Sequence, residues 1–218
     1  MFIGHWAPAL AAAAVSRKSP GLGALFVAAQ LVDWAFFALA WAGVEQMRVV
    51  PGLTVMNPMD FHHMPYTHSL LGTGLWAAGF AGVLWLVLRD RSAALIGGGV
   101  VLAHWFLDLL VHAPDLTFAG SSPRLGLALW NYPAIAMPLE LALTFGALAW
   151  YAKVRRGPIL PVAVLGGVLA LIQAINWCGP PPADPGPELY GTALFAYALV
   201  TAFAWWVGRT RTAAPSQG

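Results

Sequence analysis

The stretch VVLAHWFLDLLVH, residues 100–112, decides the interpretation of this sequence. His104, Asp108 and His112 follow one another at intervals of four residues, so a helix would place all three on one face. The residues around them are those of a membrane span, where ionisable groups are costly and usually mark a site. Two imidazoles and a carboxylate on one face form a metal-ligand set. The structural alternative is a polar contact between helices, with the aspartate bonded to histidine.

The composition identifies the class of protein. The chain has 218 residues, of which 59% are hydrophobic and 9% charged, whereas an average soluble domain carries about 25% charged residues. We therefore expect an integral membrane protein. The net charge of +2 is too small to indicate nucleic-acid binding. The single Cys178 excludes an internal disulfide framework and a thiolate zinc cluster, so a metal would have to be bound by His, Asp or Glu.

Six segments come close to the roughly 20 apolar residues that a transmembrane helix needs: 22–44, 67–88, 92–113, 133–152, 158–177 and 188–208. Strand-like alternation is absent from them. The sequence thus predicts an all-α, polytopic transmembrane helical bundle over residues 1–208, followed by a polar C-terminal tail, 209–218. Residues 2–16 form a shorter apolar helix that is either re-entrant between the other helices or a seventh span. In either case we expect His5 to lie at the mouth of this short segment.

The basic residues predict an orientation. If the turn after residue 16 is cytoplasmic and the six spans alternate, nine basic residues lie inside: Arg17, Lys18, Arg89, Arg91, Lys153, Arg155, Arg156, Arg209 and Arg211. Only Arg48 and Arg124 lie outside. This bias follows the positive-inside rule and predicts a cytoplasmic C-terminus. All six histidines then fall outside or in the outer half of the bundle, which indicates a site facing the outer side.

Two acidic residues share that half of the bundle. Asp33 lies about 16 Å below the outer end of its span, and Glu140 about 10 Å below. An unpaired carboxylate at such a depth would cost several kcal/mol or become protonated. A metal is the simplest partner for Asp33, and a hydrogen bond to a neighbouring helix is the alternative. Glu140 is a candidate ligand or an uncoordinated general base.

A second motif is DFHHMPYTHSLL, residues 60–71. Pro65 is expected to end any preceding helix, so that His68 lies in the first turn of the next span and is a candidate ligand. His63 is a candidate ligand, a residue that supports a ligand, or a phosphate contact. Asp60 either orients an imidazole through its second nitrogen, acts as a general base, or is solvated.

Several polar residues lie close to the expected mouth of the site. Arg124, Tyr66 and Asn131 are candidate substrate contacts, and ordinary interface residues are the alternative for all three. The guanidinium of Arg124 would suit phosphate. The acidic residues Glu45 and Asp115 are expected to be solvated charges at helix ends or in loops.

These motifs resemble those of the YdjM-like family of inner-membrane, metal-dependent hydrolases. HHMPYTHSLL is similar to the HRGxTHSLL motif of that family, GHWAPALAAAA to its N-terminal histidine segment, and AHWFLDLLVHAPD to its HxxxD helix. LVDWA stands where the family has an aspartate-bearing segment, although it lacks a second aspartate. Met64 and Pro65 replace the Arg and Gly of HRG, which removes a phosphate-binding arginine. More distantly, the order of residues resembles the zinc-dependent phospholipase C and single-strand nuclease superfamily.

The resemblance implies a ligand set and a location. Carried over residue by residue, the metal ligands are His5, Asp33, His68, His104 and Asp108, and His63 is the first histidine of an HxxxxH pair. It implies a multi-pass protein of the bacterial inner membrane, with its site facing the periplasm.

The leading hypothesis is a membrane-embedded hydrolase with a divalent metal, most simply zinc, that cleaves an ester or phosphodiester of a lipid or lipid-linked substrate at the outer leaflet. Glu140, Asp60 or His63 would assist catalysis, and His112 would extend the ligand set. The alternative is a non-enzymatic membrane protein that binds or transports metal, or that binds haem between paired histidines. A di-iron hydroxylase is a third possibility, although such enzymes usually need more histidines. The sequence does not specify an oligomeric state.

Overall fold

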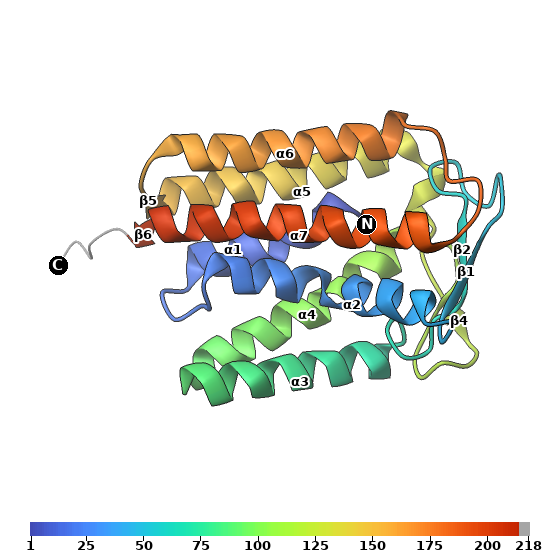
Figure 1. Cartoon of the computed structure of the whole chain (residues 1–218), viewed down its shortest axis with the longest axis horizontal. Coiled ribbons are helices and arrows are strands. Elements are labelled where there is room, and N and C mark those ends of the chain that lie inside the picture. The colour runs from blue at the N-terminus through green and yellow to red at the C-terminus, as the bar shows by residue number, and fades with distance from the viewer. Residues whose placement is uncertain (214–218) are drawn as a thin grey trace.

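The computed structural model describes residues 1–213 and is an all-α bundle with short strands at its ends (Figure 1). Six helices are long and apolar enough to cross a membrane: α2 (Leu22–Trp41), α3 (Leu70–Leu88), α4 (Arg91–Val111), α5 (Pro133–Val154), α6 (Ile159–Cys178) and α7 (Pro187–Thr210). They agree with the six predicted segments to within three residues at each end. The prediction of a polytopic helical membrane protein is therefore confirmed.

The N-terminal segment lies inside this bundle. It consists of a short 3-10 helix, η1 (Ile3–Trp6), followed by α1 (Ala7–Val15), with Pro8 in the first turn. Ile3, Trp6 and Leu10 are fully buried, and the segment packs against α5 and α2. Its alanine-rich surface suits this position because small side chains let helix backbones approach closely. The chain therefore begins near the middle of the bundle rather than at one end (Figure 1).

Short antiparallel strand pairs lie at both ends of the bundle (Figure 1). At one end, β1 (Gln46–Val49) pairs with β2 (Met59–His63), and β3 (Leu116–Thr117) pairs with β4 (Arg124–Leu125). A second 3-10 helix, η2 (Leu129–Asn131), precedes α5. At the opposite end, β5 (Arg155–Arg156) pairs with β6 (Thr212–Ala213). All these strands lie outside the six long helices, which agrees with the lack of strand-like alternation in the predicted spans.

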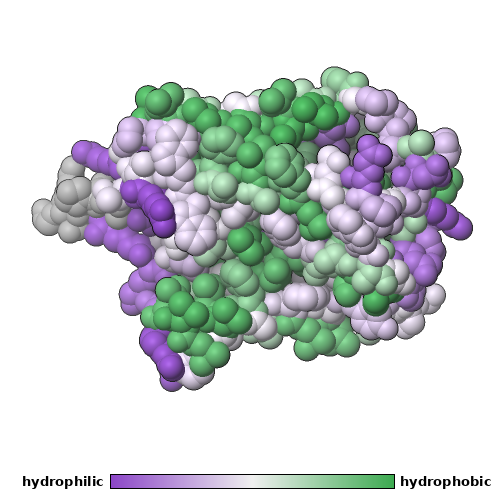
Figure 2. All heavy atoms as spheres, in the orientation of Figure 1, coloured by the Kyte–Doolittle hydropathy of each residue, from purple (hydrophilic) through white to green (hydrophobic). Residues whose placement is uncertain are grey.

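The exterior has the polarity expected of a membrane protein. Hydrophobic side chains dominate the long sides of the visible face, and hydrophilic side chains gather at both ends (Figure 2).

The C-terminal segment differs in part from the predicted polar tail. Arg211 is only 9% exposed and donates hydrogen bonds to four backbone carbonyls of residues 152–158. This anchors the end of α7 to the turn between α5 and α6, while residues 214–218 of the predicted tail lie outside the described residues.

The packing of α4 against α3 sets the position of the central motif. A Cβ atom at Gly98 would lie 3.0 Å from the carbonyl oxygen of Ala77, and one at Gly97 would overlap Leu84. Glycine at these two positions therefore permits a close approach of the two helices. The face of α4 that carries His104 and Asp108 is directed into the bundle, where both residues are 1% exposed.

Candidate metal centre

The centre of the site is the pair formed by His104 and Asp108 on α4. The two residues are one helical turn apart, and His104 Nε2 lies 3.0 Å from Asp108 Oδ2. Both atoms are buried, and neither has a hydrogen-bond partner among the described residues. The other carboxylate oxygen, Oδ1, accepts a hydrogen bond from the α-amino group of Met1 at 2.8 Å. Asp108 therefore has one satisfied oxygen and one that faces only imidazole.

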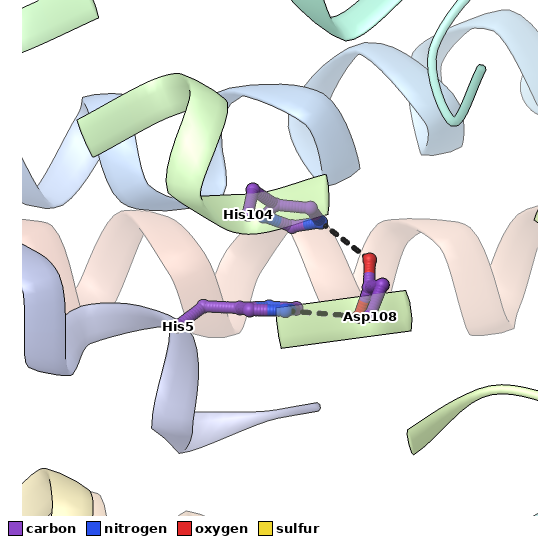
Figure 3. Close-up of side chains that lie close together, drawn as sticks. All are labelled: His5, His104 and Asp108. Atoms are coloured by element: carbon purple, nitrogen blue, oxygen red, sulfur yellow. Dashed lines mark hydrogen bonds and ion pairs between the residues drawn. The ribbon is translucent and has the colours of Figure 1, made fainter. Parts of the chain in front are cut away.

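His5 approaches this pair from η1. Its ring stacks on that of His104 with centroids 3.7 Å apart, and its Nε2 lies 2.9 Å from Asp108 Oδ1 (Figure 3). His5 is only 2% exposed. The expectation that it lies at the mouth of its segment is wrong, because η1 enters the bundle and carries its histidine to the centre.

Asp33 and His68 complete the cluster from two further parts of the chain. Asp33 belongs to α2, and His68 lies just before α3, whose N-cap residue is Ser69. Asp33 Oδ1 is 3.3 Å from His68 Nε2 and 3.5 Å from His104 Nε2. Two groups of potential ligands result, each with its donor atoms within 4.8 Å of one another: His5, His104 and Asp108, and Asp33, His68 and His104. The structure thus brings together all five residues that the family resemblance implied.

The second nitrogen of each central imidazole fixes its tautomer. His104 Nδ1 lies 2.9 Å from the carbonyl oxygen of Ala29, which can only accept, so Nδ1 carries the proton. Thr67 Oγ1 donates to Glu45 Oε2 at 2.6 Å and therefore accepts from His68 Nδ1 at 2.8 Å. If each ring carries only this proton, its Nε2 lone pair faces the carboxylates of the cluster. A lone pair opposite a carboxylate oxygen requires a proton or a cation between them.

This arrangement fits a metal ion. Histidine ligands of metals usually donate their other N–H to a carbonyl, carboxylate or similar acceptor, which orients the ring. The facing ligand atoms are 3.0 to 3.7 Å apart, close to the roughly 3.3 Å expected between ligands about 2.0 Å from a tetrahedral zinc ion. Imidazole and carboxylate are ligands that zinc accepts.

Two acidic residues that support the cluster were not predicted. Glu45 is 1% exposed and accepts hydrogen bonds from the backbone of Tyr66 and Thr67. Asp115 is 7% exposed and accepts from His112 Nδ1 at 3.0 Å. The expectation that both are solvated is wrong, because the loops after α2 and α4 fold back over the histidines. The only feature of the sequence that indicated a contact between Asp115 and His112 was their spacing of three residues.

His112 lies beside the two ligand groups rather than within them. Its Nε2 is 3.4 Å from Asp108 Oδ1, at the end of α4. Burial opposes protonation of this ring, but the carboxylates of Asp115 and Asp108 outweigh that effect and raise the pKa of His112 to about 9. Its role as a metal ligand stays a prediction.

None of the three predicted catalytic residues belongs to the two ligand groups. Glu140 is buried on α5 and accepts hydrogen bonds from Phe2 N at 2.6 Å, from Gly4 N at 3.0 Å and from Gln173 Nε2 at 3.2 Å. Asp60 forms a 2.6 Å ion pair with Arg48 on the hairpin of β1 and β2. The structure therefore brings neither carboxylate into the candidate ligand groups. For Glu140 the reason is that depth along a helix does not fix which side of the bundle a residue faces.

His63 is exposed at the end of β2 and lines a polar pocket of about 230 Å³. His68 lines the same pocket, which therefore adjoins the cluster from the end of the bundle that carries β2 and β4.

Comparisons with protein-family models, with curated proteins and with solved structures give no match.

Proposed function

We propose that this protein is a membrane-embedded, metal-dependent hydrolase, with zinc as the most suitable cation. The ligands would be His5, Asp33, His68, His104 and Asp108. The observation that carries the proposal is the set of facing ligand atoms: Nε2 of His68 and of His104, whose Nδ1 atoms are bonded elsewhere, faces Asp33 and Asp108. A divalent cation would be coordinated by these atoms and would offset the charge of the two carboxylates.

The proposed reaction is cleavage of an ester or phosphodiester. Zinc with an open coordination position lowers the pKa of a bound water towards about 7 and so supplies a nucleophile at neutral pH. Asp33 is the most accessible of the five ligands, with a side chain 16% exposed against 0 to 3% for the others. Its Oδ2 accepts a hydrogen bond from Tyr197 at 3.3 Å, which orients the carboxylate. We place the substrate-facing side of the centre at Asp33 and His68.

The surroundings favour a lipid or lipid-linked substrate. The ligands lie among helices that are long and apolar enough to span a membrane, and the pocket beside His68 opens at the end with β2 and β4. Nine of the eleven basic residues belong to the turns and helix ends at the other end of the bundle. By the positive-inside rule we infer that the site faces the outer side of the bacterial inner membrane and that the C-terminus is cytoplasmic.

A non-enzymatic metal protein or transporter is the second candidate. It would use the same ligands, so the cluster alone supports it equally well. Haem bound between His68 and His104 is less suitable, because the carboxylates of Asp33 and Asp108 lie 3.0 to 3.7 Å from the Nε2 atoms of both imidazoles. His5 and His104 offer no other pair, since their rings stack at 3.7 Å and leave no space for a porphyrin between them.

The test is metal analysis combined with a hydrolysis screen. Protein purified without chelator should contain stoichiometric transition metal, and His104→Ala should remove it. His62→Ala is the matched control, since His62 lies outside both ligand groups. The wild type should also release products from a lipid extract, and the His104 variant should not. Undiminished metal in the His104 variant would overturn the centre, whereas metal without hydrolysis would favour the non-enzymatic candidate.

A further inference from the structure

The polar pocket next to the metal centre has its own binding chemistry. Its walls come from residues 61–65, at the end of β2, and from residues 117–124, between β3 and β4. His68 contributes to both the pocket and the cluster. A group bound in this pocket would therefore lie beside the proposed reaction centre.

The pocket contains an unneutralised cation. Two arginines lie at this end of the bundle, and Arg48 is neutralised by Asp60 at 2.6 Å. Arg124 lines the pocket and makes no ion pair within residues 1–213; its Nη2 donates one long hydrogen bond, 3.4 Å, to the carbonyl of His62. The guanidinium thus retains its charge and most of its N–H groups. Such a group binds phosphate through paired hydrogen bonds.

Two buried polar atoms on residues that line the pocket lack partners among the described residues. They are His62 Nδ1 and Asp115 Oδ2. The other oxygen of Asp115 is bonded to His112, and the whole residue is 7% exposed. Buried polar groups in native proteins are almost always hydrogen-bonded, so these two atoms are available to a polar ligand in the pocket. A carboxylate oxygen would repel a bare anion, but it would accept a hydrogen bond from a hydroxyl group.

We propose that this pocket binds a phosphate ester that carries a hydroxyl group. Arg124 and His62 would contact the phosphate, and Asp115 Oδ2 would accept a hydrogen bond from the hydroxyl group. Glycerol phosphate is the simplest group with this chemistry, either free or as the headgroup of a lipid. The inference rests on the proposed function in one respect, because it makes the pocket the subsite that presents the ester to the metal.

Calorimetric titration of the purified protein with glycerol 3-phosphate tests the pocket. Arg124→Gln should weaken binding roughly tenfold or more, because a charge-assisted phosphate contact is lost. Arg48→Gln is the matched control: it removes the same charge from the same end, and binding should stay within about twofold. Equal affinities in the wild type and the Arg124 variant would overturn the proposal, and so would equal losses in the two variants.

Two further comparisons sharpen the result. Glycerol phosphate should bind more tightly than inorganic phosphate, and equal affinity would overturn the role given to Asp115. Nanodiscs of phosphatidylglycerol and of phosphatidylcholine identify the source of the group. If binding of phosphatidylglycerol depends on Arg124, the ligand is a lipid headgroup. If only the binding of soluble glycerol phosphate depends on Arg124, the ligand is a free ester. If the binding of neither depends on Arg124, the proposed pocket is contradicted.

The metal proposal can fail independently. Titrations are made with both zinc-loaded and chelator-treated protein, and Arg124-dependent binding should persist in the treated protein. If the wild type holds no metal but still binds glycerol phosphate through Arg124, the proposed hydrolase is overturned and the pocket stands. If instead the wild type holds metal but does not bind glycerol phosphate through Arg124, the metal centre stands and the pocket is overturned.

Discussion

Asp108 and Glu140 are both carboxylates buried inside the bundle, at 1% and 4% exposure, but their neighbours differ. Glu140 accepts hydrogen bonds from two backbone amides and the side chain of Gln173. Asp108 Oδ2 instead faces Nε2 of His104 at 3.0 Å and Nε2 of His68 at 3.7 Å. Both residues are costly to bury. The donors around each one, rather than its depth, distinguish a structural carboxylate from a candidate metal ligand.

The largest expected effect is loss of the metal from Asp108→Asn. An amide at this position neither carries the charge nor provides the ligand oxygen that faces His104, so bound metal should fall to background. Glu140→Gln is the matched control and should retain wild-type metal content. Elemental analysis of the two purified variants makes this measurement, and equal metal content in both would remove the distinction between the two carboxylates.

Replacing Glu140 by an apolar residue should mainly affect stability. Glu140→Leu leaves the amides of Phe2 and Gly4 without their acceptor inside the bundle. We expect a loss of about 3 kcal/mol in the free energy of unfolding, since an orphaned buried donor costs roughly 1–3 kcal/mol. Denaturation of the chelator-treated protein in mixed micelles measures this loss. Unchanged stability would mean that Glu140 does not hold the N-terminal segment that carries His5.

A smaller effect is expected from the partner of His68. Thr67→Val removes the oxygen that accepts from His68 Nδ1, and losing such a partner typically costs about 10–100-fold in metal affinity. Thr73→Val is the matched control, because Thr73 is also fully buried and donates to a carbonyl, that of Thr67, but does not contact His68. Competition with a fluorescent zinc chelator gives both affinities. Equal affinities would show that the orientation of His68 does not depend on Thr67.

The spans and most of the site could be predicted from the sequence, for physical reasons. A span is a local property, so six apolar stretches gave six helices with nearly correct ends. His104 and Asp108 lie one turn apart on a single helix, and their relation follows from helix geometry alone. Asp33 and His68 could be assigned to the same zone from the depth of each along its span.

Other parts of the site depend on tertiary structure. His5 was placed at a mouth because nothing local shows that η1 enters the bundle. Glu45 and Asp115 look like loop charges until the loops fold over the histidines. Glu140 was assigned to the site by depth, but its helix directs it towards Phe2 and Gly4.

The smallest expected effect tests the comparison without metal. In Asp108→Asn, the new amide nitrogen would take the place of Oδ2 and donate a hydrogen bond to the unprotonated Nε2 of His104. The same change removes the charge that faces the Met1 ammonium, so the contact with His104 is isolated by a double-mutant cycle with His104→Gln. In chelator-treated protein the cycle should show no favourable coupling between Asp108 and His104, because a carboxylate opposite a neutral imidazole is an opposed pair of acceptors. Thermal unfolding of the four stripped proteins measures the coupling. A favourable coupling of several kcal/mol would instead mean that the carboxylate is needed as the partner of a protonated histidine. Asp108 would then be a structural carboxylate of the same kind as Glu140, and the metal centre would lose its principal support.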